Sequence, residues 1–162
     1  MKIQKITFSV VICTLHNLKG LEKCIDSITQ QTLKPNEVII VHGDLDEKME
    51  ESITQKIFLI LKSNLITLKY VKTIRSLIIQ RNTGIDNACG DVIAFLDDDV
   101  ILDKNYFYYL LEAYQLKWSE SLGGIQGTII EGTGDKPWQP EEIIKRIFLL
   151  GRMTGRGRLL PS

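Results

Sequence analysis

Short apolar runs alternate along the chain with segments in which apolar residues recur every three or four positions. The first pattern is typical of buried strands and the second of amphipathic helices. Such alternation predicts an α/β fold, with a mostly parallel sheet flanked by helices. The expected strands are 6–14, 37–41, 66–71, 92–96 and 124–130, and the expected helices are 18–28, 49–61, 78–89, 105–117 and 141–150.

The composition is that of one ordinary globular domain. The 162 residues are 44% hydrophobic, and 20 Lys and Arg balance 20 Asp and Glu, so the formal net charge is zero. A neutral chain has no overall field that attracts nucleic acid, which is therefore not an expected partner. The three cysteines are widely spaced, which predicts small core residues rather than a disulfide framework or a zinc site. No apolar run has the roughly 20 residues of a membrane span, so we expect a cytoplasmic chain.

The sharpest polar feature is the acidic triplet Asp97–Asp99, directly after an apolar run. Ligands of open parallel sheets bind beyond the carboxyl ends of strands. Adjacent carboxylates repel one another unless a cation offsets their charge, and Mg²⁺ and Mn²⁺ prefer carboxylate, water and phosphate oxygens. The triplet therefore predicts a metal site that holds a diphosphate, with a solvated acidic turn as the simpler alternative. The glycine patterns of an EF-hand, a P-loop and a dinucleotide-binding turn are absent from the sequence.

Five segments in a fixed order carry a more specific signal: Ser9–Thr14, Leu21–Gln31, Pro35–Val41, Arg81–Ile85 and Ala88–Asp99. Together they resemble the N-terminal half of a family 2 glycosyltransferase, over roughly residues 8–130. The resemblance implies a GT-A fold, which is the Rossmann-like fold of nucleotide-diphospho-sugar transferases. It also implies metal-dependent, inverting transfer of a sugar from a nucleotide-sugar, with a UDP-sugar favoured. The implied acceptor is a saccharide or a lipid-linked molecule, as in cell-wall or polysaccharide biosynthesis.

The same resemblance assigns site residues, although it identifies no catalytic base. His42 and Gly43 stand where the family often has an aspartate that holds the nucleobase, so the base is not identified, and His42 itself is more simply a structural residue. Arg81 has a surface arginine as its alternative interpretation. The residues implied for the nucleotide-sugar are Cys13, Thr14, Asp44, Arg81, Asn82, Asp97 and Asp98, and those implied for Mn²⁺ or Mg²⁺, in the manner of a DXD motif, are Asp98 and Asp99.

The end of the sequence leaves two functions open. The resemblance stops before the acceptor-binding part of the family, so residues 1–162 are expected to form a single GT-A-like domain truncated on the acceptor side. A catalytically incomplete nucleotide-sugar-binding or interaction fragment is the alternative. A phosphotransfer receiver domain is disfavoured, because its acidic pair would follow the first strand, where Thr14–His16 stand. The apolar helix expected over 141–150, with basic residues around it, allows a peripheral membrane contact, and packing against the sheet is its alternative.

Overall fold

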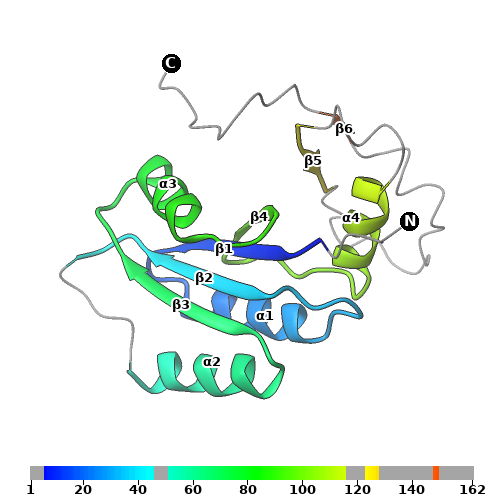
Figure 1. Ribbon diagram of the computed structural model, residues 1–162. Coiled ribbons are helices and arrows are strands. Elements are labelled where there is room, and N and C mark those ends of the chain that lie inside the picture. The colour runs from blue at the N-terminus through cyan, green and yellow to red at the C-terminus, as the bar shows by residue number, and fades with distance from the viewer. Residues whose placement is uncertain (1–5, 46–50, 116–122, 128–147, 150–162) are drawn as a thin grey trace, which may run out of the picture. The chain divides into compact units, whose positions relative to one another are not determined.

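The computed structural model describes residues 6–45, 51–115, 123–127 and 148–149. The chain divides into two compact units, Met1–Tyr108 and Tyr109–Ser162. The elements, labelled in Figure 1, are β1 (Phe8–Thr14), α1 (Leu18–Thr29), β2 (Glu37–His42), α2 (Glu51–Ser63), β3 (Thr67–Lys72), α3 (Leu77–Asn87), β4 (Val92–Asp97), α4 (Tyr106–Gln115), β5 (Ile125–Gln126) and β6 (Phe148–Leu149).

The first unit contains a four-stranded parallel sheet in the order β3-β2-β1-β4. The chain leaves β1 for β2 and β3 on one side and then returns to the other side of β1 as β4. Strand order therefore reverses between β1 and β4, and open α/β sheets bind ligands at such a reversal. The register pairs Cys13 with Asp97 and Thr14 with His42, so the ends of β1, β2 and β4 lie at one edge. Segments predicted separately to carry the site are thus neighbours.

Helices cover both faces of this sheet, with α1 and α2 on one face and α3 on the other (Figure 1). Alternate strand residues point to opposite faces, and both sets are buried in β1 and β2. On the α3 side, Val11, Ile39 and Val41 form a fully buried cluster. Burying each such side chain stabilises the fold by roughly 1.5–3 kcal/mol. Continuous apolar runs in the sequence predicted this two-sided burial.

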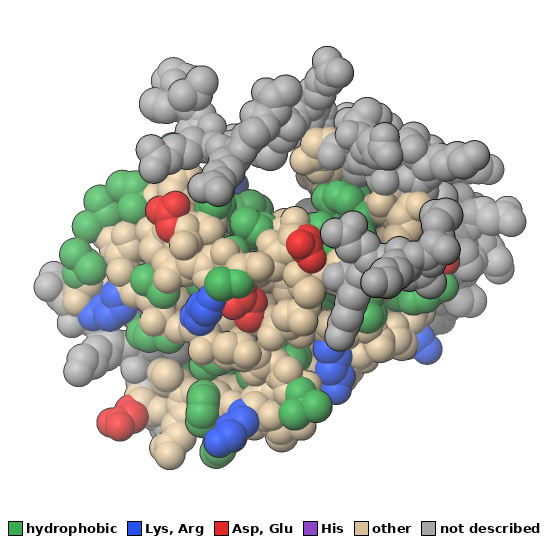
Figure 2. All heavy atoms as spheres, viewed as in Figure 1, with side chains coloured by type: hydrophobic (Ala, Val, Ile, Leu, Met, Phe, Trp, Pro, Cys, Tyr) green, Lys and Arg blue, Asp and Glu red, His purple; other side chains and the backbone are tan. Residues whose placement is uncertain are grey.

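α3 packs on β1 through a glycine rather than through an apolar stripe. A Cβ atom added to Gly84 would lie 2.3 Å from Val11 Cγ1, so the helix backbone approaches the strand closely. One turn earlier, Gln80 is only 7% exposed, whereas Leu77 and Ile78 are 51% and 70% exposed. Hydrophobic side chains consequently gather at the surface over the start of α3 (Figure 2). The buried residues of α3 are thus a glycine and a polar residue, whereas a surface helix usually buries its apolar residues.

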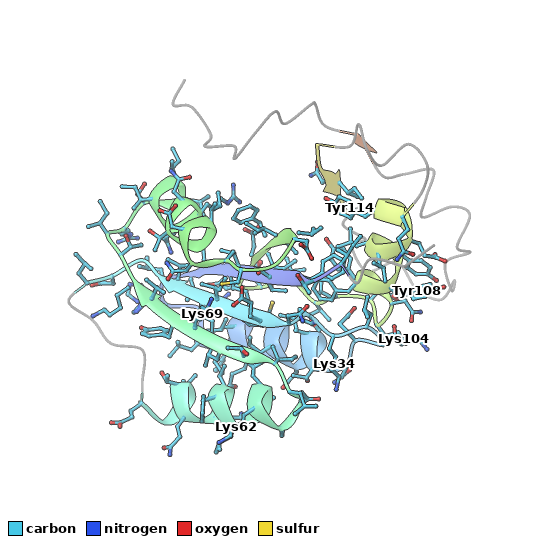
Figure 3. The ribbon with its side chains drawn as sticks, viewed as in Figure 1. Lys34, Lys62, Lys69, Lys104, Tyr108 and Tyr114 are labelled. Atoms are coloured by element: carbon cyan, nitrogen blue, oxygen red, sulfur yellow. The ribbon has the colours of Figure 1, made fainter. Side chains whose placement is uncertain are left out.

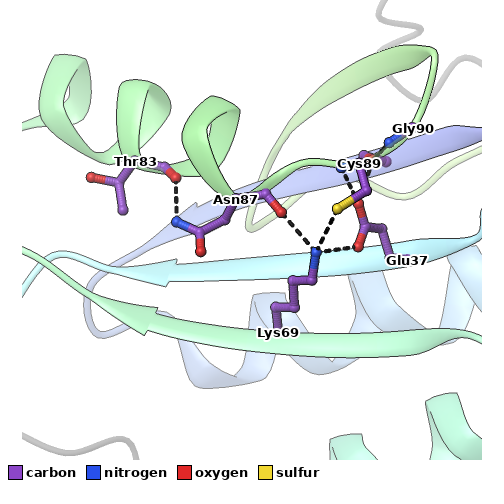
Figure 4. Close-up of polar contacts among 7 residues, drawn as sticks. Glu37, Lys69, Thr83, Asn87, Cys89 and Gly90 are labelled. Carbon is purple, nitrogen blue, oxygen red and sulfur yellow. Dashed lines mark hydrogen bonds and ion pairs between the residues drawn. The ribbon is translucent and has the colours of Figure 1, made fainter.

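An ion pair ties the amino-terminal half of the sheet to the segment between α3 and β4 (Figure 4). Lys69 Nζ lies 2.8 Å from Glu37 Oε2 and donates a 2.8 Å hydrogen bond to the Asn87 carbonyl. Glu37 Oε1 accepts hydrogen bonds from Ser9 Oγ at 2.6 Å and from the Cys89 amide at 2.7 Å. Burial raises the pKa of the Glu37 carboxyl, but these hydrogen bonds and the Lys69 charge outweigh burial and lower the pKa below its ordinary value.

Replacing Lys69 by methionine should make the protein more sensitive to acid. Because the folded-state pKa of Glu37 is lowered, its stabilising contribution is complete above the ordinary value of 4.5 and is lost as pH falls through the lower folded value. Without Lys69 the Glu37 pKa rises, so the loss should begin at a higher pH. Urea unfolding between about pH 3 and 7 measures this onset. Lys62→Met is the matched control, since Lys62 lies on α2 (Figure 3) and its Nζ atom is 5.5 Å from the centroid of the Phe58 ring. An equal change in Lys62→Met would contradict the assignment.

The structure confirms the α/β fold and places its first eight helices and strands within two residues of their predicted bounds. The helix predicted over 141–150 is wrong at 148–149, where β6 pairs antiparallel with β5. Periodicity does not distinguish a short apolar run in a strand from one in a helix. The remaining residues of that predicted helix, and the membrane contact expected from it, lie outside the described residues, as do 128–130 of the last predicted strand. No helix in the described ranges is long and apolar enough to cross a membrane.

Candidate functional site

Asp98 is held in a fixed orientation at the reversal of strand order. Thr14, the last residue of β1, donates from Oγ1 to Asp98 Oδ2 at 2.6 Å. Asn17 Nδ2 donates to the other carboxylate oxygen, Oδ1, at 3.2 Å. The Asn17 oxygen in turn accepts the Gly20 amide at 3.1 Å, which caps α1. The partly exposed Asp98 is therefore attached both to β1 and to the start of α1, whereas Asp97 and Asp99 are exposed.

Arg81 brings one positive charge to the triplet from α3. Its Nη2 atom lies 3.7 Å from Asp97 Oδ1, and its guanidinium carbon lies 6.0 Å from the centroid of the Phe95 ring. Phe95 and Asp97 are alternate residues of β4, so they point to the same face of the sheet, which α3 covers. Arg81 thus faces the acidic triplet and could contact a phosphate bound there.

The turns after β1 and β2 are joined by a buried histidine. His42 is 2% exposed, and its Nε2 lies 2.9 Å from the Leu15 carbonyl. Because a carbonyl oxygen only accepts, Nε2 carries the hydrogen, and in the neutral ring Nδ1 accepts from the Tyr70 hydroxyl at 2.8 Å. Both ring nitrogens are used within the fold, in agreement with the structural role favoured from the sequence. Asp44, two residues beyond β2, is partly exposed at the same edge.

The three cysteines differ in their surroundings. Cys24 is fully buried, and burial raises the pKa of its thiol to about 12. Cys13 is half-buried at the end of β1. Burial raises the pKa of the Cys13 thiol to about 11, with Arg81 opposing and Asp97 contributing to the rise, so this thiol is neutral at physiological pH. Cys89 is exposed, so the prediction of a core residue is wrong there; its Sγ lies 3.2 Å from Lys69 Nζ.

The structure brings most of the predicted site residues to one edge of the sheet. Thr14 contacts Asp98 and Arg81 contacts Asp97, with Cys13 paired to Asp97 in the register. Asn82 follows on α3, partly exposed, without a hydrogen bond to the triplet among the described residues. Sequence reasoning assigned no role in the site to two further residues here. Asn17 lies in the turn after β1 as the N-cap of α1, and Gln80 is a buried polar residue of α3 that belongs to no motif.

The triplet fits a divalent metal that also binds substrate oxygens. Within the described ranges, no three Asp, Glu, His or Cys side chains are arranged to hold a metal ion. Each oxygen of Asp98 accepts one hydrogen bond and keeps a free electron pair, and Asp99 is exposed beside it. Mg²⁺ sites commonly use one or two carboxylates and take their other ligands from water and phosphate. Asp98 and Asp99 could therefore hold a divalent cation whose other ligands come from water and phosphate.

Comparisons with known proteins identify relatives of this chain. A family model described as Glycosyl transferase family 2 matches residues 9–159. Glycosyltransferase GlyA of Streptococcus pneumoniae serotype 4 is 29% identical over 109 residues, which make up 63% of this chain and 14% of GlyA. The chain therefore spans about one seventh of the length of this curated relative.

Two solved structures show the same fold. TarS 1–349 of S. aureus matches 80% of this chain and 39% of its own length, with a TM-score of 0.55 and 20% identity; it has also been solved with UDP and with UDP-GlcNAc. Mannosyltransferase PcManGT of Pyrobaculum calidifontis, in complex with GDP-Man and Mn²⁺, matches 73% of this chain and 34% of its own length, with a TM-score of 0.58 and 19% identity. These similarities confirm the GT-A glycosyltransferase fold.

Proposed function

The chain belongs to glycosyl transferase family 2, and we propose that it binds a nucleotide-sugar at the carboxyl ends of β1, β2 and β4 and transfers the sugar to an acceptor. The observation that carries this proposal is the fixed Asp98 carboxylate, oriented by Thr14 and Asn17 where strand order reverses. Residues 1–162 would form the donor-binding side of one GT-A domain.

The charges of the site suit a diphosphate with a metal. In the proposal, Asp98 and Asp99 hold Mn²⁺ or Mg²⁺, and Arg81 approaches a phosphate beside Asp97. The metal, when bound, offsets the negative charge that develops on the departing nucleoside diphosphate. Arg81 adds a guanidinium, which matches phosphate oxygens in a planar arrangement. Neither role requires a proton transfer from the protein.

The nucleoside would lie along the ends of β1 and β2. In the proposal, Cys13, Thr14 and Asp44 form this end of the site, and Asn82 of α3 belongs to the donor side. Cys13 would contribute a neutral thiol, because burial holds its pKa near 11. A UDP-sugar is favoured, and the support is that TarS has been solved with UDP and UDP-GlcNAc, although PcManGT has been solved with GDP-Man.

The transfer itself would be a single displacement. An acceptor hydroxyl oxygen forms a bond to the anomeric carbon while the bond from that carbon to the diphosphate oxygen breaks, which inverts the configuration. The hydroxyl proton passes to a base, and the nucleoside diphosphate leaves with the bonding electrons. A saccharide or lipid-linked acceptor at the cytoplasmic face of a membrane, in cell-wall or polysaccharide assembly, completes the proposal.

A thermal-shift panel of UDP, GDP, CDP and dTDP, each with Mn²⁺, Mg²⁺ or chelator, tests the donor site. One nucleotide at about 20 times its Kd should stabilise the native state by about 1.8 kcal/mol, which raises Tm by roughly 4–7 °C in a chain of this size. The shift should depend on the metal and identify the base. A folded chain that gives no shift with any nucleotide would contradict the proposal, and product formation with an acceptor would separate transfer from binding alone.

A further inference from the structure

Gln80 of α3 lies beneath the edge of the sheet that carries the candidate site. It is 7% exposed, and its Nε2 donates to two backbone carbonyls, Thr14 O and Val41 O, both at 3.0 Å. A side-chain amide has two N–H groups, and both are used here. The opposite orientation of the amide would set its oxygen against two carbonyl oxygens, so the hydrogen-bond pattern determines the orientation. One side chain thus joins the ends of β1 and β2.

The surrounding backbone leaves Gln80 little room to move. A Cβ atom added to Gly43 would lie 2.8 Å from the Cδ and Nε2 atoms of Gln80. The Gly43 amide donates to the same Thr14 carbonyl at 2.9 Å. The Thr14 carbonyl therefore accepts from both Gly43 and Gln80, which fixes the turn after β2 against the end of β1.

The residues joined in this way are those that would contact a nucleotide. Thr14 carries the hydroxyl that orients Asp98, and Gly43 directly precedes Asp44. Arg81, the next residue of α3, reaches Asp97. Gln80 therefore sets the spacing between the ends of β1 and β2, along which the nucleoside would lie.

We infer that Gln80 is a positioning residue of the nucleotide site, which holds the strand ends at the spacing that a nucleoside diphosphate requires. The inference rests on the proposed function and extends it to a residue that touches neither metal nor sugar. Rotamers locked by buried hydrogen bonds are what keeps a binding site within the small tolerance that recognition needs. Methionine at this position keeps the length of the side chain but donates nothing to the two carbonyls.

The test compares Gln80→Met with the wild-type chain at a temperature where both are folded. The Kd for the nucleoside diphosphate with Mn²⁺ should rise about tenfold, because two buried carbonyls lose their donor and the turns shift. The Kd for inorganic pyrophosphate with Mn²⁺, which lacks the nucleoside, should change by less than about threefold. Gln55→Met, at an exposed glutamine of α2, is the matched control and should leave both constants unchanged. If Gln80→Met does not fold, Gly43→Ala serves instead. The methyl group of the new alanine would displace the Gln80 side chain, although the glutamine itself is still present.

The outcomes that would contradict the role of Gln80 can be told apart by experiment. A lower Tm with an unchanged nucleotide Kd would mean that Gln80 serves only the stability of the fold and would overturn the inference. An equal loss of affinity for the nucleotide and for pyrophosphate would overturn the inference as well, because the substitution would then have disturbed the acidic triplet. Failure of the wild-type chain to bind any nucleoside diphosphate would overturn the proposed function and this inference with it.

Discussion

Replacing Asp98 by asparagine should lower the affinity for a nucleoside diphosphate in Mn²⁺ by about 100-fold or more, which corresponds to roughly 2.7 kcal/mol of binding free energy. Asp98 is the carboxylate of the triplet that both Thr14 and Asn17 orient, so its charge is the one placed in advance for a metal. Asparagine keeps the size of the side chain and removes the negative charge. Titration calorimetry with Mn²⁺ and with chelator measures the effect, which should disappear in chelator.

Asp26→Asn is a suitable control for Asp98→Asn. Asp26 is an exposed aspartate of α1, so its replacement removes the same charge from a different part of the surface. Its effect on nucleotide affinity should stay within about threefold, because exposed charges beyond the Debye length are largely screened. If the metal-dependent affinity of Asp98→Asn equalled that of the wild-type chain, the assignment of the metal to the triplet would be wrong.

Replacing Gly84 by alanine should lower the free energy of unfolding by about 2–3 kcal/mol. At a solvent-exposed position inside a helix, replacing glycine by alanine stabilises the fold by about 1 kcal/mol, because alanine has the higher helix propensity. Here the added Cβ atom would meet Val11 Cγ1 at 2.3 Å, and Val11 is fully buried under α3. Either α3 moves outward or the sheet deforms, and both displace Arg81 and Gln80. Urea unfolding measures the loss.

Two further variants separate a clash from a general effect of removing a glycine. Gly124→Ala should change the free energy of unfolding by less than about 0.5 kcal/mol, because an added Cβ there meets nothing within 4 Å. Val11→Ala in the Gly84→Ala background removes both Cγ atoms, so the double variant should be less destabilised than the sum of the two single changes. Strict additivity would contradict close packing between Gly84 and Val11.

The sequence pattern predicted the sheet well because its strands are buried on both faces and therefore continuous in apolar residues. It also predicted that Asp97–Asp99 follow a strand, and the parallel register then placed them beside Thr14. The pattern was weakest at α3, whose inner side carries Gln80 and Gly84 rather than apolar residues. It failed at 148–149, where two apolar residues form a short strand instead of a helix.

The local sequence by itself determined the order of helices and strands, the acidic triplet and the family to which the chain belongs. The helices, the strands and the triplet depend on residues that are close together in the chain, and the family depends on five such local segments in a fixed order. Only the tertiary structure decided which side of α3 is buried and which partners orient the triplet. Thr14 and Asp98 are 84 positions apart, and Gln80 reaches Thr14 across 66 positions. Such contacts arise from the packing of distant segments, which no local periodicity encodes.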